Sequence, residues 1–593
     1  MSRAGVISPV ASVSSLDVPR VAALRWAVAS LFLSAAFQLL CFIRWPGNPS
    51  QDVNHAVFAA QNLLAHGQLK SVNFLADYGA DLAQYAKPHW LIHWPPGQAF
   101  LYAVVLGLGL SPGPATKALG FLGVLGGGLG WVLLARFLGA SRNCMFAVAA
   151  AYPWLPFGVT AYVAYTNDHL ALFIMPWTCL VLLRLTSVME PSPGNSGGSS
   201  KEEWYRLWAA ALIAILGAAV KYTLARVFAG ASIYLFWRDR SRLRNLGILW
   251  GLGLLLLLLF PGLLYLLVNS AYGKRFALPV QPGAFSKAGF AMNLVNYTAA
   301  GAAGWDIVLA KAGALVDPHF HTHFPVAIVM LVPSFLMLII WLPRLVRSGC
   351  GRLRSFIMLL GILTAGLWAM LVASTWLSGL QWDFSEESRF YKPIVLLWLL
   401  PCALFLDRLP WKEVRRSVAF YSFALPVALV AIGEVRLGLL RELWLRLPQS
   451  GIAWIWTYET GHARFLPDFA ARRSRKPDLL IGSDPRMMVE LGVPIAYWRI
   501  LQQRRAGYWT SKDLEIWAII EADQVPALLE GVAGACSAER VAVPAGYPFA
   551  FYILNLNARD GPRTNCQRLG PHEALLLRSS HLKRSAVHHS KDH

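Results

Sequence analysis

Two aspartates stand where a carboxylate could act on a substrate at a membrane surface. Asp52 lies in the segment PSQDVNH (49–55), directly after the first apolar run of the chain. A carboxylate that is partly withdrawn from water is a stronger base, and it can take a proton from a hydroxyl nucleophile. The same position suits the start of a helix, because an apolar helical pattern follows, and Ser50 or Asp52 would then cap the free amides. Both interpretations of Asp52 remain open in the sequence.

Asp168 lies in the segment YTNDH (165–169), at the head of a second apolar helix. Helix capping is again the alternative role, with Thr166 and Asn167 as competing caps. Two acids, each at the outer end of a span, resemble a site more than one acid does. The candidate catalytic residues are therefore Asp52 and Asp168.

Several basic side chains are of the type that binds phosphate. The loop 375–392 ends with Arg389 and Lys392 immediately before an apolar run. A guanidinium fork pairs well with phosphate oxygens, whereas basic residues beside aromatic ones by default anchor a span at the membrane interface. The same two roles are open for the other basic candidates. The candidate substrate- or phosphate-binding residues are Lys87, Lys221, Glu386, Arg389 and Lys392.

The segment DPHFHTH (317–323) carries three histidines at alternate positions. In an extended strand they would point to one side and, with the aspartate, could ligate a divalent metal ion. In a helix they would not converge, and a solvated polar loop is the alternative. The candidate metal ligands are Asp317, His319, His321 and His323. The chain shows no nucleotide-binding fingerprint and no Cys/His quartet for zinc.

Composition indicates that membrane-spanning helices must position these residues. The chain has 593 residues, of which 56% are hydrophobic and 14% charged, with a mean hydropathy of +0.47. Ordinary soluble domains have roughly 25% charged residues. Soluble enzymes, secreted disulfide scaffolds and disordered chains are thereby excluded. We expect a mainly α, polytopic helix bundle whose spans each need about 20 apolar residues.

The spans and their orientation follow from the apolar runs and the arginines. A leader (1–23) precedes a signal anchor at 24–43, and the segment 94–110 is apolar for only about 14 residues after its two prolines, short enough to be re-entrant or interfacial. If this segment does not span, the later even-numbered connections face the side of the N-terminus; if it spans, the charge asymmetry is inverted. Seventeen basic residues then occupy five short loops on the side of the N-terminus. The positive-inside rule favours about eleven spans, a cytoplasmic N-terminus and an outer C-terminus. The further runs lie near 114–135, 143–163, 170–184, 207–220, 222–237, 246–268, 325–343, 355–374, 393–407 and 417–434.

The chain divides into a transmembrane domain at 24–434, with a large first outer loop at 44–113, and an outer α/β domain at 435–580. Short strand-like runs that alternate with helical stretches predict the α/β domain. The strand-like runs are 479–481, 516–520, 541–543 and 549–554, and the helical stretches are 485–491 and 525–532. An outer location permits a Cys536–Cys566 disulfide. A basic, disordered tail is expected at 581–593.

The order of these motifs resembles the GT-C superfamily of integral-membrane glycosyltransferases, especially its protein O-mannosyltransferase and lipid A aminoarabinose transferase branch. The resemblance rests on the following elements: Asp52 in a large outer loop, WPPG (94–97), RFLG (136–139), Asn167-Asp168, a span beginning near Lys221, Arg389-Phe390-Tyr391 and an outer C-terminal domain.

This resemblance implies a helix bundle with outer-loop interfacial helices. It also implies transfer of a sugar, with inversion, from a polyprenyl-phosphate carrier to an acceptor. Asp52 would be the general base, Asp168 would lie near the sugar or a metal ion, and Lys87 and Arg389 would lie near the carrier phosphate. The family often has an acidic pair where this chain has Asp52-Val53, which speaks against a two-carboxylate first loop.

We therefore expect a multi-pass glycosyltransferase of the plasma or inner membrane that works on the outer face. Its partners would be a lipid-linked sugar, membrane lipids and an acceptor that is a glycan, a lipid or a protein. The alternatives are a transporter or flippase of a lipid-linked or anionic substrate, and a GT-C-like scaffold without catalysis. The net charge of +21 mostly reflects the arginine-rich loops, so nucleic-acid binding has no support.

Overall fold

The computed structural model has two compact units, which we call the helical unit and the sheet unit. The helical unit comprises Met1–Gly47, Gly113–Tyr265 and Pro279–Trp454, and the sheet unit comprises Asn48–Pro112, Leu266–Leu278 and Ile455–His593. The residues that the structure describes are 17–42, 51–72, 82–90, 96–155, 161–162, 165–188, 351–378, 393–394, 396–408, 465–473, 475–482, 484–498, 514–521, 524–526, 537–544 and 549–555. The predicted spans between 207 and 343, the span 417–434, the tail 581–593 and the pair Cys536 and Cys566 lie outside them.

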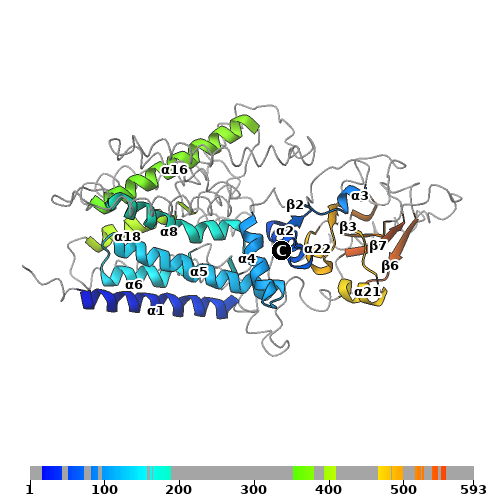
Figure 1. Cartoon of the computed structure of the whole chain (residues 1–593), viewed down its shortest axis with the longest axis horizontal. Coiled ribbons are helices and arrows are strands. Elements are labelled where there is room, and N and C mark those ends of the chain that lie inside the picture. Colours follow the sequence, from blue (N-terminus) through cyan, green and yellow to red (C-terminus); the bar gives the residue numbers. More distant parts are fainter. Residues whose placement is uncertain are drawn as a thin grey trace, which may run out of the picture. The chain divides into compact units, whose positions relative to one another are not determined.

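Long apolar helices dominate the described part of the helical unit (Figure 1). Two stretches, Ala22–Leu40 in α1 and Pro112–Phe137 in α5, are long and apolar enough to cross a membrane. The helices are α1 (Asp17–Phe42), α5 (Pro112–Phe137), α6 (Arg142–Ala151), α8 (Asn167–Val188), α16 (Gly351–Ser378) and α18 (Leu399–Arg408), with 3-10 turns η1 (Tyr152–Trp154) and η5 (Leu396–Trp398).

The apolar run 143–163 does not form one continuous helix. Helix α6 ends at Ala151, and the 3-10 turn η1 follows with Pro153 inside it. Proline lacks the amide that would donate to the carbonyl four residues earlier, so the helix cannot continue regularly through it. The side chain of Gln38 on α1 donates to the Pro153 carbonyl at 2.5 Å. A hydrogen bond from α1 therefore holds the chain at the point where α6 ends.

Helix α5 presents a glycine-rich face to its neighbours. A Cβ at Gly120 would come within 2.7 Å of the Ala161 carbonyl oxygen, and one at Gly130 within 2.9 Å of the Trp177 indole nitrogen. A Cβ at Gly123 would overlap the Phe173 ring. Without side chains at these positions, other segments approach the α5 backbone closely, as small residues allow at helix interfaces in membrane proteins.

The start of α6 is fixed by a buried acid on α18. Ser141 is the N-cap of α6, and its hydroxyl oxygen accepts from the Cys144 amide. The Ser141 amide and hydroxyl both donate to the Asp407 carboxylate, which is buried. A carboxylate at a helix N-terminus is stabilised by the helix dipole, so this contact joins α6 to α18.

The sheet unit combines the first outer loop with the C-terminal part of the chain. In the loop, α2 packs on α4, and Leu64 of α2 lies against Gly107 of α4. Helix α4 has 12 residues and is thus about 18 Å long, too short to span a bilayer core of about 30 Å. The loop elements are α2 (Gln51–His66), β1 (Lys70–Ser71), α3 (Leu82–Tyr85), β2 (His89–Trp90) and α4 (Pro96–Gly107).

The C-terminal part forms a mixed five-stranded sheet in the order β4-β3-β5-β7-β6. Strand β3 pairs in parallel with β4 and β5, whereas β7 is antiparallel to both β5 and β6. Three strands, β3, β5 and β7, lie on the apolar runs that predict them. The elements are α21 (Phe465–Arg473), β3 (Leu479–Gly482), α22 (Arg486–Leu491), β4 (Ile495–Tyr497), β5 (Ile516–Glu521), β6 (Ser537–Val541) and β7 (Phe549–Asn555).

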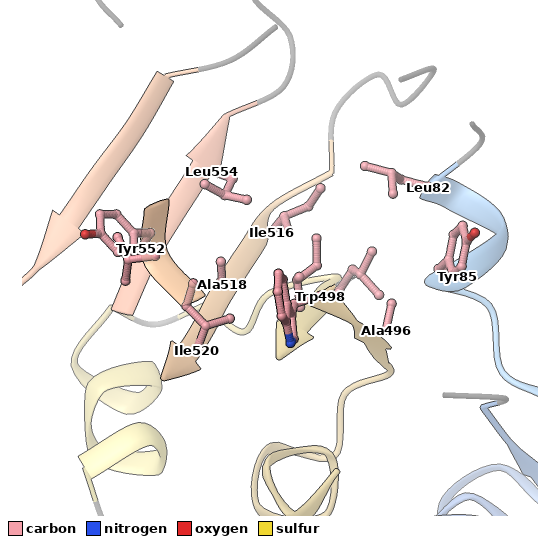
Figure 2. Close-up of a cluster of buried hydrophobic side chains, with 12 residues drawn as sticks. Leu82, Tyr85, Ala496, Trp498, Ile516, Ala518, Ile520, Tyr552 and Leu554 are labelled. Atoms are coloured by element: carbon pink, nitrogen blue, oxygen red, sulfur yellow. The ribbon is translucent and has the colours of Figure 1, made fainter. Parts of the chain in front are cut away.

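Alternate residues of the sheet pack on two different partners, as the two-residue period of a strand requires. On one face, Phe469 of α21 makes edge contacts with Trp517 and Phe551, at centroid distances of 5.2 and 5.0 Å. On the other face, Leu82 and Tyr85 of α3 join the buried cluster of sheet side chains (Figure 2). Part of the first outer loop therefore completes the core of the C-terminal sheet.

Candidate functional site

Three of the predicted site residues lie in the described part of the structure. Asp52 and Lys87 are in the sheet unit, and Asp168 is in the helical unit. The other candidates lie outside the described residues, and their roles remain predictions. These are Lys221, Asp317, His319, His321, His323, Glu386, Arg389 and Lys392.

Asp52 is half-buried in the first turn of α2. The residues that follow it, from Val53 to Ala60, are all buried, so the helix turns into the core immediately after the carboxylate. Two of them are polar, Asn54 and His55, with 0% and 2% of their surface exposed. Asp52 thus stands at the boundary between a buried polar segment and the surface of its unit.

A short β-ribbon is bonded to the side of α2. His55 Nδ1 lies 3.3 Å from the Ser71 hydroxyl, which donates to the His55 carbonyl at 3.2 Å. Nearer the other end of the helix, the Asn62 side chain donates to the Lys70 carbonyl at 3.0 Å. Strand β1 therefore runs, from Lys70 to Ser71, toward the N-terminal end of α2, where Asp52 lies.

Lys87 lies just before the second strand of this ribbon. Strand β2 is antiparallel to β1, with Ser71 opposite His89 and Lys70 opposite Trp90. Lys87 precedes His89 by two residues and lies in the bend before β2, where its amide donates to the Gln84 carbonyl at 3.4 Å. Lys87 is exposed, whereas Asp52 is half-buried in the first turn of α2. The folded loop thus carries both a cation and a carboxylate.

Helix α4 adds a buried amide to this region. It begins at Pro96, where proline costs no hydrogen bond because the first amides of a helix have no partner within it. Gln98 follows in the first turn and is fully buried, on a helix that packs against α2. Asn54, His55 and Gln98 are polar groups of the folded loop that the sequence analysis did not single out, although PSQDVNH (49–55) and WPPG (94–97) contain or adjoin them.

Asp168 is not the capping residue of α8. The Asp168 amide donates to the Thr166 hydroxyl oxygen at 3.2 Å, so Thr166 caps the helix. The Thr166 amide donates to His169 Nδ1 at 2.9 Å, which leaves the ring proton of neutral His169 on Nε2. Asp168 is 9% exposed. Capping of α8 is therefore the role of Thr166 and not of Asp168.

The helical unit holds further groups that could matter for function, the stacked pair Tyr165 and His169 and the buried Lys117. The Tyr165 ring stacks on His169 with 6.0 Å between centroids. Burial raises the pKa of the Tyr165 phenol above its usual range, so this group stays protonated and is not a base. Lys117, on the glycine-rich face of α5, is buried with 4% of its surface exposed. Sequence analysis missed Lys117, although an ionisable residue within an apolar run is a signal of function.

The described residues contain no group of three or more His, Cys, Asp or Glu side chains that could hold a metal ion. The predicted ligand set at 317–323 lies outside them. A divalent metal ion therefore remains a prediction, and no chemical step below depends on it.

No family model and no curated protein matches the sequence. Solved structures do resemble it. ArnT from Cupriavidus metallidurans is 14% identical in its apo state, with a TM-score of 0.46, 93% of this chain covered and 100% of ArnT. The undecaprenyl phosphate complex of ArnT gives 15% identity, a TM-score of 0.44, and coverage of 92% and 100%. A mutant arabinofuranosyltransferase AftD from Mycobacteria gives 16% identity and a TM-score of 0.39, with 89% of this chain and 42% of AftD covered.

ArnT and AftD are both GT-C glycosyltransferases, the superfamily that the sequence motifs resemble. At this identity and these TM-scores, the similarity assigns no role to any residue. The chemistry of this chain has to be argued from its own side chains.

Proposed function

We propose that this protein is a membrane glycosyltransferase that takes a sugar from a polyprenyl-phosphate carrier on the extracytoplasmic side. The observation that carries the proposal is the folded first loop, which holds a half-buried carboxylate, Asp52, in the first turn of α2 and an exposed cation, Lys87, just before the β-ribbon that is bonded to α2. A base and a phosphate-binding cation are the two groups that such a transfer needs.

The proposed reaction is a single displacement at the anomeric carbon. Asp52 takes the proton of the acceptor hydroxyl. At the same time the oxygen of that hydroxyl forms a bond to the anomeric carbon. The bond from carbon to the phosphate oxygen breaks, and the carrier phosphate leaves with the electron pair. The Lys87 ammonium stabilises the charge that develops on the phosphate. The configuration of the sugar is inverted because one displacement occurs.

For Asp168 we propose a separate role in binding hydroxyl groups of the sugar. Arg389 and Lys392 are proposed as further phosphate-binding cations, and Glu386 and Lys221 as further substrate-binding residues. The lipid carrier is proposed to be a polyprenyl phosphate, in keeping with the undecaprenyl phosphate bound by one ArnT structure.

The test of the function is transfer by the purified full chain in proteoliposomes. We expect release of undecaprenyl phosphate, and a sugar-bearing product detected by mass spectrometry, when one member of a panel of undecaprenyl-phosphate sugars is mixed with cell-envelope extract. Movement of the lipid-linked sugar across the vesicle membrane with no covalent product would favour a transporter. Binding of the donors without turnover in any extract would favour an inactive scaffold.

Lys87→Gln is expected to weaken binding of undecaprenyl phosphate by about 10- to 100-fold, because a charge-assisted hydrogen bond contributes roughly 1.5–3 kcal/mol. The measurement is a dissociation constant from native mass spectrometry of the full chain in detergent. Arg472→Gln is the matched control, since it removes one exposed positive charge from α21 in the same unit. Equal affinity of wild type and Lys87→Gln would remove Lys87 from the phosphate site.

A further inference from the structure

The segment 82–90, which we call the strap, connects the two halves of the sheet unit and carries Lys87. It begins with α3, continues through a turn, and ends in β2. The Ala86 amide donates to the Leu82 carbonyl at 3.2 Å, and the Lys87 amide to the Gln84 carbonyl at 3.4 Å. The position of Lys87 is therefore set by α3.

The first end of the strap is held in the core of the C-terminal sheet. Leu82 and Tyr85 are 0% and 3% exposed and share one face of α3, as residues three apart do on a helix. Figure 2 shows both side chains directed at the sheet, opposite Ile516, Ala496 and Trp498. A helix of four residues has no stability of its own in water. The conformation of α3 thus depends on this packing.

The second end of the strap is held on α2. Strand β2 pairs with β1, and β1 is bonded to α2 through His55 and Asn62. The same helix is joined to the C-terminal part directly, because the Gln61 side chain donates to the Val489 carbonyl of α22 at 3.2 Å. Lys87 lies exposed between two fixed points, one on the sheet and one on α2, whose first turn contains Asp52.

We infer that the C-terminal sheet is a positioning element of the donor site, which fixes the position of Lys87 through Leu82 and Tyr85. The inference rests on the proposed function, in which Lys87 binds the carrier phosphate. Leu82 and Tyr85 touch no substrate and act through the strap. A distortion of the sheet face that they cover is transmitted to the phosphate-binding cation.

The test compares Leu82→Ala and Tyr85→Ala with Phe469→Ala in the purified full chain. Phe469 packs on the opposite face of the same sheet, so its truncation weakens the domain without touching the strap. We expect the two strap variants to speed hydrogen–deuterium exchange at the amides of residues 86 and 87, and to weaken undecaprenyl phosphate binding by about 10-fold. Phe469→Ala should lower the unfolding midpoint and leave both readouts near wild type.

Conservative variants separate positioning from a general loss of structure. Leu82→Met and Tyr85→Phe keep most of the buried volume and should restore exchange protection and affinity to near wild type. Should an alanine variant not fold, Leu82→Val provides a milder truncation with the same expected order of effects. Wild-type exchange in the strap variants, or equal effects in Phe469→Ala, would overturn the inference.

The test of the strap and the test of the proposed function can fail independently of each other. If Lys87→Gln binds undecaprenyl phosphate as wild type does, the phosphate role of Lys87 fails, and the inference fails with it as a statement about the donor site. Exchange at residues 86 and 87 still decides whether the sheet holds the strap. Faster exchange with unchanged affinity in the strap variants, while Lys87→Gln binds weakly, would overturn the positioning role alone.

Discussion

Asp52→Asn is expected to slow sugar transfer by about 10²- to 10⁴-fold, the usual contribution of a general base. Asparagine has nearly the same shape as aspartate but cannot take the proton of the acceptor hydroxyl. Asp52 lies in the first turn of α2, where loss of its charge costs about 0.3–1 kcal/mol of helix stabilisation. The fold should therefore survive the change. The measurement is the initial rate of undecaprenyl phosphate release in proteoliposomes.

Two comparisons show whether the loss belongs to the base. Asp468→Asn makes the same chemical change in the first turn of α21, in the same unit, and should transfer at the wild-type rate. Binding of undecaprenyl phosphate to Asp52→Asn should equal or exceed that of wild type, because a negative charge near the phosphate has been removed. Wild-type transfer by a folded Asp52→Asn protein would show that Asp52 is not the base.

The helices of the described part follow closely from apolar length. The run 114–135 predicts α5, which extends over Pro112–Phe137, and the short run after Pro95-Pro96 predicts a non-spanning helix where α4 has 12 residues. The lengths of these helices agree with the predicted runs, because a span needs a minimum length of apolar chain, whatever its neighbours are. The run 143–163 shows the limit of length alone, since Pro153 divides it.

The assembly of the sheet unit could not be predicted in the same way. The four residues of α3, Leu82–Tyr85, carry no periodic signal, and their partners on β3 and β5 lie about 400 residues further along the chain. Only the packed core shows that they belong together. A pairing of this kind depends on three-dimensional complementarity, which neither hydropathy nor spacing encodes in a single sequence.

For the candidate site, the sequence proposes residue types, and their geometry has to come from the structure. In the sequence, helix capping is an alternative role for both Asp52 and Asp168. The hydrogen bond from the Asp168 amide to the Thr166 hydroxyl excludes this role for Asp168, because Thr166 is the capping residue. Lys117 was not predicted as a site residue, because it lies within an apolar run of the sequence. Its burial on the glycine-rich face of α5 is visible only once that face is packed.

Gly120→Ala is expected to destabilise the protein by about 1–3 kcal/mol, the usual cost of overpacking. The added Cβ would lie 2.7 Å from the Ala161 carbonyl oxygen and 2.9 Å from its carbonyl carbon. These are backbone atoms, so no rotation of a side chain can relieve the contact. Either α5 or the segment at 161–162 has to move. Thermal unfolding of the full chain in detergent measures the loss.

Gly126→Ala is the matched control, because it makes the same change on the same helix. A Cβ at Gly126 meets nothing within 4 Å among the described residues, and alanine favours a helix over glycine by about 1 kcal/mol. This variant should be as stable as wild type or more stable. If Gly120→Ala and Gly126→Ala unfold at the same temperature, the close approach of α5 to residue 161 is wrong.

A double variant separates a side-chain clash from a backbone clash on this face. A Cβ at Gly127 would overlap the Tyr152 hydroxyl, which is buried and has no hydrogen-bond partner among the described residues. Tyr152→Phe removes that oxygen and should recover part of the stability lost in Gly127→Ala. The same Tyr152→Phe change should not rescue Gly120→Ala, since the obstacle there is the Ala161 backbone. If Tyr152→Phe recovers the same stability in both glycine variants, the two clashes do not have separate causes. The helices around α5 would then relax in the same way for either added methyl group.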